Sequence, residues 1–241
     1  MAIRRETLVY DGPGGVFESI VAWDGALSGP RPGVLLFPNV LGLKEADLEK
    51  AEALAALGYV ALAADIYGQG KRTTRESPDP ALYMNQLNAD RALMRERLHG
   101  ALATLAAHPQ VDAAKLAAIG FCFGGKCVLD LARSGGAILG GVSFHGVYDR
   151  PDYPSNVPIA PKLLICHGWD DPLGDPVTVT ALAAELTEAG ADWQLHVYGN
   201  AGHAFTDRAM PVGQRPGFGY DVAADRRSWQ AMENFLAELF G

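Results

Sequence analysis

Cysteine is scarce in this chain, and long apolar runs are absent. The three cysteines are an odd number and include no C-x-x-C pair, which is typical of a reducing compartment in which thiols stay free. The first residues, MAIRRETLVYDG, have no apolar run behind their arginines, so they do not fit a signal peptide. No later segment approaches the roughly 20 apolar residues of a membrane span. We therefore expect a cytoplasmic protein without a membrane partner.

Positive charge is also in short supply. The chain has 20 Lys and Arg residues against 28 Asp and Glu residues, a formal net charge of -8. Nucleic-acid binding depends on clustered Lys and Arg that neutralise phosphates, so a nucleic-acid partner is not expected. The 49% hydrophobic and 20% charged composition is that of an ordinary globular protein. With no internal repeat, linker or low-complexity tract, we expect residues 1–241 to form a single domain.

Short apolar runs alternate with helical patterns along the chain. A turn-rich stretch at 11–15 predicts a hairpin within 7–23, and the later predicted strands are 33–37, 59–65, 115–121, 139–145, 162–168 and 193–198. The predicted helices are 44–57, 81–107, 124–132, 177–189 and 221–240. This alternation implies right-handed crossovers. The expected fold class is α/β, a mainly parallel sheet of about eight strands with helices on both faces.

Residues 117–127, AAIGFCFGGKC, can be read as two different sites. Gly120, Gly125 and Lys126 match the phosphate-binding pattern G-x-x-x-x-G-K-[ST] except at its last position, where Cys127 stands. The preceding strand is the fifth that we predict, whereas a phosphate loop normally follows an early strand. A thiol is also a poor ligand for Mg²⁺. These features argue against a phosphate loop.

The same residues form the pattern G-x-C-x-G around Cys122. This is the sharp strand-to-helix turn that exposes a nucleophile, with cysteine in place of the usual serine. The backbone of such a nucleophile is strained, so the residues two before and two after it must be small, and Gly120 and Gly124 meet that need. The following helix directs its free N–H groups at the thiol, which favours the thiolate. We therefore expect Cys122 to be a nucleophile rather than a buried structural cysteine.

A nucleophile in this turn needs a base, and the base needs an acid that orients it. The chain order expected for this fold is nucleophile, acid, histidine. Asp170 and Asp171 follow a predicted strand directly, and His203 lies in a glycine-rich loop after the last strand. We expect His203 to accept the nucleophile's proton, with Asp171 preferred as its orienting acid and Asp170 as the alternative. His145 and His167 lie at strand ends before the acid and are expected only to line the pocket.

The oxyanion of a tetrahedral intermediate needs N–H donors. They normally come from the residue after the nucleophile and from the loop after the third strand. The expected donors are therefore the backbone N–H groups of Phe123 and Val40. In that loop Gly42 permits close backbone approach. Asn39 is expected to contact substrate as a further donor, the alternative being a polar turn residue.

Five segments of the chain together resemble the dienelactone hydrolase family of α/β-hydrolases. In chain order they are FPNVLGL, GFCFGG, HGWDDP, AGHAF and DRRSWQAMENFLAELF. The resemblance covers nearly the whole chain, and the cysteine is specific because most relatives of this fold use serine. It implies a triad of Cys122, His203 and Asp171, no metal or cofactor, and hydrolysis of a lactone or ester through a thioester acyl-enzyme.

The chain departs from the family pattern at two places. The best-known members have a glutamate in the loop after the third strand that helps to generate the thiolate, and Asn39 stands there in this chain. An amide cannot take a proton, which leaves the thiolate to the histidine and the helix dipole. Those members also bind a substrate carboxylate through arginines. At one such position this chain has Asp207; the neighbouring Arg208 is the expected substrate-binding residue, and Arg72 and Arg75 are further candidates.

The sequence thus predicts a cofactor-free cysteine hydrolase whose partner is a small-molecule ester or lactone. Two other functions stay open at this stage. The first is a non-catalytic binding or regulatory protein that keeps the fold, which the asparagine at position 39 would fit. The second is a thiol redox sensor built on Cys122 and Cys127, whose spacing puts the two side chains on different sides of a helix and makes a disulfide awkward.

Overall fold

A computed structural model describes residues 2–156 and 158–241, in which eight strands form one sheet. The strands are β1 (Ile3–Gly12), β2 (Gly15–Asp24), β3 (Arg31–Phe37), β4 (Val60–Ala63), β5 (Val111–Phe121), β6 (Gly140–Phe144), β7 (Lys162–Gly168) and β8 (Trp193–Tyr198). Their order in the sheet is β1-β2-β4-β3-β5-β6-β7-β8. β2 pairs antiparallel with β1 and β4, and all other neighbours pair in parallel.

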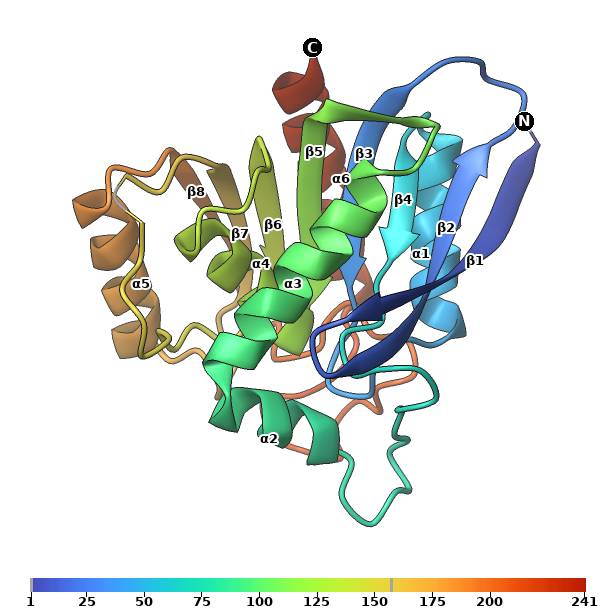
Figure 1. Ribbon diagram of the computed structural model, residues 1–241. Coiled ribbons are helices and arrows are strands. Elements are labelled where there is room, and N and C mark those ends of the chain that lie inside the picture. The colour runs from blue at the N-terminus through green and yellow to red at the C-terminus, as the bar shows by residue number, and fades with distance from the viewer. Residues whose placement is uncertain (1, 157) are drawn as a thin grey trace.

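Helices cover both faces of this sheet. They are α1 (Glu45–Ala56), α2 (Leu82–Ala89), α3 (Arg91–Ala106), α4 (Phe123–Arg133), α5 (Pro176–Glu188) and α6 (Val222–Phe240). α1 and α6 pack on one face, and α3, α4 and α5 pack on the other (Figure 1). The predicted fold class, a mainly parallel α/β sheet covered on both sides, is confirmed.

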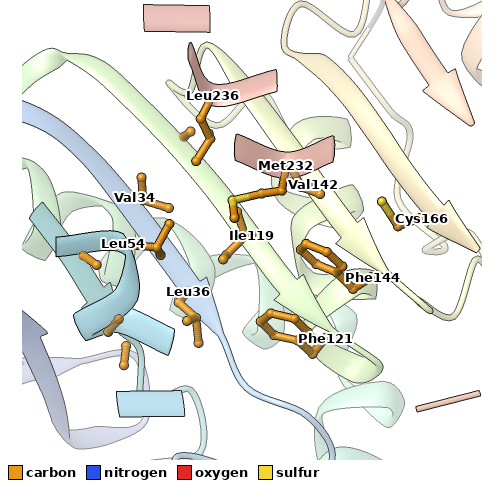
Figure 2. Packing of buried hydrophobic residues seen from close by; sticks show 14 of the residues in the cluster. Val34, Leu36, Leu54, Ile119, Phe121, Val142, Phe144, Cys166, Met232 and Leu236 are labelled. Carbon is orange, nitrogen blue, oxygen red and sulfur yellow. The ribbon is translucent and has the colours of Figure 1, made fainter. Parts of the chain in front are cut away.

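The central strands are apolar on both sides because both of their faces are covered. Successive residues of a strand point to opposite faces, so Leu35 packs toward α3 and α4 while Leu36 packs toward α1. Figure 2 shows the second of these layers, in which Leu36 and Ile119 lie near Leu54 of α1 and Met232 of α6. A continuous apolar run is the expected signature of such a doubly covered parallel strand.

Several element boundaries differ from the sequence prediction: the hairpin predicted within 7–23 runs from Ile3 to Asp24, and the strand predicted at 59–65 spans Val60–Ala63. The helical pattern at 81–107 is broken at Asp90, whose backbone has φ of -133° and ψ of 77°. The Asp90 side chain accepts a hydrogen bond from the N–H of Leu93 at 2.9 Å and so caps α3, a local bond that competes with a continuous helix. β5 begins at Val111 rather than 115, because this polar end of the strand pairs with Arg31 of β3 before a register shift.

The topology brings six loops to one edge of the sheet. β3, β4, β5, β6, β7 and β8 run in parallel, so their carboxyl ends lie at the same edge. The residues that follow these ends include those predicted to act in catalysis. In open α/β sheets, ligands bind in the crevice at this edge.

Candidate active site

The turn between β5 and α4 has the geometry predicted for a nucleophile. Cys122 stands between the strand and the helix with φ of 55° and ψ of -114°, a conformation that a residue with a side chain rarely adopts. A Cβ atom at Gly120 would collide with the carbonyl of Gly124, and one at Gly124 would collide with the carbonyl of Phe37. The two glycines are required by this close packing, as predicted.

The phosphate-loop pattern in the same stretch is a coincidence of glycine spacing. A Cβ atom at Gly125 would lie 2.6 Å from Oγ of Ser143. Glycine is therefore needed at this position for packing within the protein, not for a phosphate. Lys126 is buried, and its ammonium group pairs with Asp149 at 2.7 Å and donates to Asn88 at 2.9 Å. Both the glycine and the lysine therefore have internal roles.

The structure brings His203 and Asp171 together. His203 donates from Nδ1 to Oδ2 of Asp171 at 2.7 Å, and both residues are buried. The other carboxylate oxygen of Asp171 accepts the N–H of Leu173 at 2.8 Å, which fixes the carboxylate. Asp170 is exposed, and among the described residues its carboxylate has no hydrogen-bond partner or ion pair. The geometry thus favours Asp171 over Asp170 as the acid that orients His203.

The thiol of Cys122 and the imidazole of His203 interact as an acid–base pair. Burial alone would raise the pKa of Cys122, but the positive charge of His203 outweighs it, and the pKa of this half-buried thiol is lowered. Burial acts to lower the pKa of His203, whereas the Cys122 thiolate and the bond to Asp171 raise it to about 10. At neutral pH these shifts favour a thiolate–imidazolium pair.

The backbone N–H groups of Phe123 and Val40 act on the thiol of Cys122. Both help to lower its pKa. The loop that carries Val40 is held in place by Tyr67, whose hydroxyl donates to the Val40 carbonyl at 3.0 Å. Asp65 in turn accepts the N–H of Tyr67 at 3.0 Å. The sequence prediction missed Tyr67, although its position just after the fourth strand was a usable signal.

His145 contacts the backbone of the nucleophile rather than only lining a pocket. Its Nδ1 accepts the N–H of Cys122 at 3.2 Å, a proton shared with the carbonyl of Phe144, so Nε2 carries the imidazole proton and donates to Oγ1 of Thr206 at 2.8 Å. The residue has φ of 37°, and its ring meets that of His203 edge-on, with centroids 5.2 Å apart. Burial, and then the charge of His203, lowers the pKa of His145 well below its ordinary value. It is therefore a neutral ring.

The side chain of Asn39 forms hydrogen bonds within the protein. Its Oδ1 accepts the N–H of Leu41 at 3.1 Å, and its Nδ2 donates to Oδ2 of Asp207 at 3.4 Å. The same oxygen of Asp207 pairs with Arg75 at 2.6 Å. Asn39 thus lies in the predicted loop beside Val40, but these bonds make it a turn residue and a partner of Asp207.

Arg208 is not brought to the triad. Its side chain is 81% exposed and its Nε lies 3.9 Å from Asp225. It lines a surface cleft of about 640 Å³ together with Lys50 and Trp229. Through its ion pair with Asp207, Arg75 is instead the arginine that lies near the loop of Asn39 and Val40, which we call the oxyanion loop. The sequence had favoured Arg208 for this place.

The other two cysteines contrast with Cys122. All three thiols are free. Cys127 and Cys166 are buried, and burial raises the pKa of Cys127 and raises that of Cys166 to about 12. A thiol of this kind is inert. These environments argue against a redox pair of Cys122 and Cys127.

The described part of the chain shows neither a metal-binding cluster nor a membrane-spanning helix. Within residues 2–156 and 158–241, no group of three or more His, Cys, Asp or Glu side chains is arranged to hold a metal ion. None of the helices there is both long enough and apolar enough to cross a membrane.

Comparison with known proteins identifies the family to which the chain belongs. A model of the dienelactone hydrolase family matches residues 19–240. A solved dienelactone hydrolase-like promiscuous phosphotriesterase from metagenomic libraries superposes with a TM-score of 0.91, at 39% identity and with 100% of both chains covered. A Bradyrhizobium protein named as a probable 2-oxo-3-(5-oxofuran-2-ylidene)propanoate lactonase is 27% identical over 188 residues, 74% of this chain and 75% of the relative.

A third comparison shows the fold alone. The dienelactone hydrolase of Anabaena variabilis superposes with a TM-score of 0.67 at 20% identity, over 98% of this chain and 99% of that one. The family match covers nearly all of the chain, including every residue of the candidate site. The chain therefore belongs to the dienelactone hydrolase family and is a lactone or ester hydrolase.

Proposed function

We propose that the protein hydrolyses small lactones or carboxylic esters with Cys122 as its nucleophile, through a thioester acyl-enzyme. The observation that carries this proposal is the environment of one sulfur atom. The Cys122 thiol has a lowered pKa, and it faces His203 and the N–H groups of Phe123 and Val40. Those features are what a nucleophile, its base and an oxyanion site require.

The first half of the reaction forms the thioester. The Cys122 thiolate attacks the carbonyl carbon, a C–S bond forms, and the carbonyl π electrons move to oxygen. The N–H groups of Val40 and Phe123 stabilise that oxyanion. When the intermediate collapses, the C–O bond breaks and the leaving alkoxide takes the proton of the His203 imidazolium. For a lactone, the released alcohol stays attached to the acyl group.

The second half restores the enzyme. Neutral His203 takes a proton from water, the hydroxide adds to the thioester carbonyl, and collapse breaks the C–S bond. The products are the carboxylic acid and the original thiolate–imidazolium pair, so protons and electrons balance. Asp171 holds the Nδ1 proton of His203 throughout at 2.7 Å, which keeps Nε2 directed at the reaction. In this scheme no carboxylate is needed at position 39 to form the thiolate.

The proposal is tested with p-nitrophenyl esters of short acids and with simple lactones. We expect Cys122→Ala to lower kcat/KM on the order of a thousandfold or more. Cys127→Ala is the matched control, because that thiol is buried on α4 with a raised pKa, and it should keep its activity. Mass spectrometry after rapid acid quenching should find the acyl group on the peptide that contains Cys122. Equal rates in Cys122→Ala and wild type would overturn the assignment.

Hydrolysis of phosphotriesters is a second candidate function. The solved relative that is described as a promiscuous phosphotriesterase covers the whole chain at 39% identity. A thiolate with two N–H donors can in principle also attack phosphorus, because negative charge again develops on an oxygen. Turnover of diethyl p-nitrophenyl phosphate, lost in Cys122→Ala, would support it. A single burst that ends in a phosphorylated thiol would instead restrict turnover to carboxylic esters.

A further inference from the structure

An ion pair joins two loops beside the proposed oxyanion site. Arg75 belongs to the loop after β4, and Asp207 follows His203 by four residues in the loop after β8. The guanidinium of Arg75 meets Oδ2 of Asp207 at 2.6 Å, and the Asp207 side chain is only 15% exposed. Asn39, the residue before Val40, donates to the same oxygen at 3.4 Å. A carboxylate of the chain itself therefore stands beside the loop that would hold the substrate carbonyl.

The position of this carboxylate is fixed by bonds to both of its oxygens. Oδ1 of Asp207 accepts the N–H of Ala209 at 3.1 Å, while Oδ2 receives Arg75 and Asn39. An anion held in this way neutralises the one guanidinium that contacts it, and it keeps the amide of Asn39 turned toward it. A charge-assisted bond of this kind is stronger than a neutral one.

We propose that Asp207 is a specificity-determining residue, which occupies Arg75 and Asn39 and so directs the site toward uncharged esters and lactones. Substrates with a carboxylate near the scissile bond are disfavoured, because they must either displace Asp207 from Arg75 or lie next to it. Both cost free energy where water is partly excluded. The formal net charge of -8 on the chain acts in the same direction at longer range. This inference rests on the proposed esterase function and names its substrate class.

Two other arginines, Arg72 and Arg215, are candidate receptors for a substrate carboxylate. Arg72 donates from Nε to the carbonyl of Leu43 at 2.7 Å, so it braces the oxyanion loop. Arg215 lies over the ring of Phe218 at 3.7 Å from its centroid, and that ring packs 5.3 Å from the ring of His203. Arg215 is therefore the rival receptor, and the experiment includes it.

The experiment compares two substrates that differ in one group. They are the mono-p-nitrophenyl ester of adipic acid, which ends in a carboxylate, and the same ester of adipic acid monoamide, which ends in a neutral carboxamide of the same shape. Wild type should prefer the carboxamide. Asp207→Asn keeps an acceptor for Ala209 but removes the charge, and it should raise the relative kcat/KM of the carboxylate ester at least about tenfold, mainly through KM. Adding Arg75→Gln should abolish that gain.

The controls separate a local effect from a general change of charge. Glu76→Gln removes one negative charge from the residue beside Arg75; its side chain is exposed and has no ion pair within the described residues, so the ratio should not change. Arg75→Gln alone leaves Asp207 unpaired and should lower turnover of the carboxylate ester several-fold more than that of the carboxamide. This second variant keeps the test decisive if Asp207→Asn folds poorly.

The possible failures are distinguishable. If Asp207→Asn leaves the ratio at the wild-type value while both esters still depend on Cys122, the specificity inference is wrong and the esterase proposal stands. The inference is equally wrong if wild type prefers the carboxylate ester and loses that preference in Arg215→Ala. If Cys122→Ala hydrolyses the carboxamide ester as fast as wild type, the proposed function itself fails.

Discussion

Two clusters of polar side chains are buried at helix α4, one at its N-terminal end and one at its C-terminal half, and they are built differently. The proposed catalytic cluster, called the catalytic cluster below, lies at the carboxyl edge of the sheet and consists of Cys122, His145, Asp171, His203 and Thr206. The ion cluster lies between α3, α4 and α5 and consists of Arg91, Asp130, Arg133 and Glu185. All four residues of the ion cluster are buried, as are those of the catalytic cluster apart from the half-buried cysteine.

The ion cluster satisfies its charges. Arg133 donates to both carboxylate oxygens of Glu185 at 2.8 Å and to Asp130 at 3.2 Å. Arg91 donates to Asp130 from two nitrogens, at 2.9 and 2.6 Å. In the catalytic cluster, by contrast, Nε2 of His203 is buried and no oxygen or nitrogen atom of the described residues bonds to it.

The difference shows how burial serves two purposes in one fold. Where buried charges hold helices together, every donor has an acceptor, because an orphaned charge is very costly. In the catalytic cluster, Nε2 of His203 is left for the sulfur of Cys122 and for substrate. Cys122 and His145 in that cluster also have positive φ angles. Strain and unmet hydrogen bonds thus mark the reactive cluster. The following predictions test that contrast.

The largest effect on catalysis is expected when Nε2 of His203 is removed. His203→Gln should lower kcat/KM for a neutral ester on the order of a thousandfold, because the thiolate loses its counter-charge and the leaving group loses its proton donor. The folded state should survive, as judged by thermal unfolding. His196→Gln is the control, since that residue is exposed on β8. Near-normal catalysis by His203→Gln would contradict the assignment of the catalytic cluster.

A substitution in the ion cluster should lower the free energy of unfolding. Arg133→Met leaves the carboxylates of Asp130 and Glu185 buried with fewer partners, so the free energy of unfolding should fall by about 3–5 kcal/mol. Arg150→Met is the matched change, because Arg150 reaches Glu185 at 3.3 Å from a side chain that is 61% exposed, and it should cost less than about 1 kcal/mol. Urea titration measures both. Equal small losses would mean that the two clusters do not differ as described.

Alkylation by iodoacetamide should report the thiolate–imidazolium pair. Because the pKa of Cys122 is lowered, the midpoint of its reaction rate should lie at a lower pH than that of a free thiol, and the rate should fall as pH drops through that lowered pKa. A second change is expected as pH rises through about 10, where His203 loses its proton. At pH 7 the rate should exceed that of a free thiol about tenfold, since a thiol with a pKa of ~8.5 is only a few per cent ionised there.

The control for this titration is the Cys122→Ala variant, in which the two buried thiols should not react. A rate for wild type that rises with a midpoint near ~8.5 would show an ordinary thiol. That outcome would favour the non-catalytic binding protein over the hydrolase.

The smallest effect is expected at His145. His145→Phe keeps the ring but removes the acceptor for the N–H of Cys122 and the donor to Thr206, bonds of 3.2 and 2.8 Å. The loss of a net 1–2 kcal/mol of hydrogen bonding should lower kcat about tenfold with little change in KM. Thr206→Val removes only the second bond and should cost less. An unchanged kcat in His145→Phe would make this ring a packing residue.

Much of the site could be predicted from the sequence because its signals are local. The spacing of Gly120 and Gly124 around Cys122 reflects steric contacts within one turn, and the structure reproduces them. Asp171 and His203 follow strands whose carboxyl ends meet at one edge in any parallel sheet, so their chain order sufficed to propose them. The family resemblance added the substrate class, which no periodicity contains.

Other parts of the site depend on contacts between distant segments. Arg75 and Asp207 are 132 positions apart, and their pairing could not be inferred from either loop. The choice of Asp171 over Asp170 likewise depended on which carboxylate the β8 loop approaches. Tyr67 and His145 were missed as positioning residues because each acts through a backbone group of a different loop, Val40 and Cys122 respectively.

The α/β alternation, the cysteine turn and the chain order of Cys122, Asp171 and His203 can be read from the sequence alone. These features follow from backbone sterics and from apolar periodicity, which act over a few residues. The protonation of the Cys122–His203 pair and the partner of Asp207 depend instead on the folded arrangement. Charge interactions depend on burial and on distances in space, and those are set when the strands assemble into one sheet.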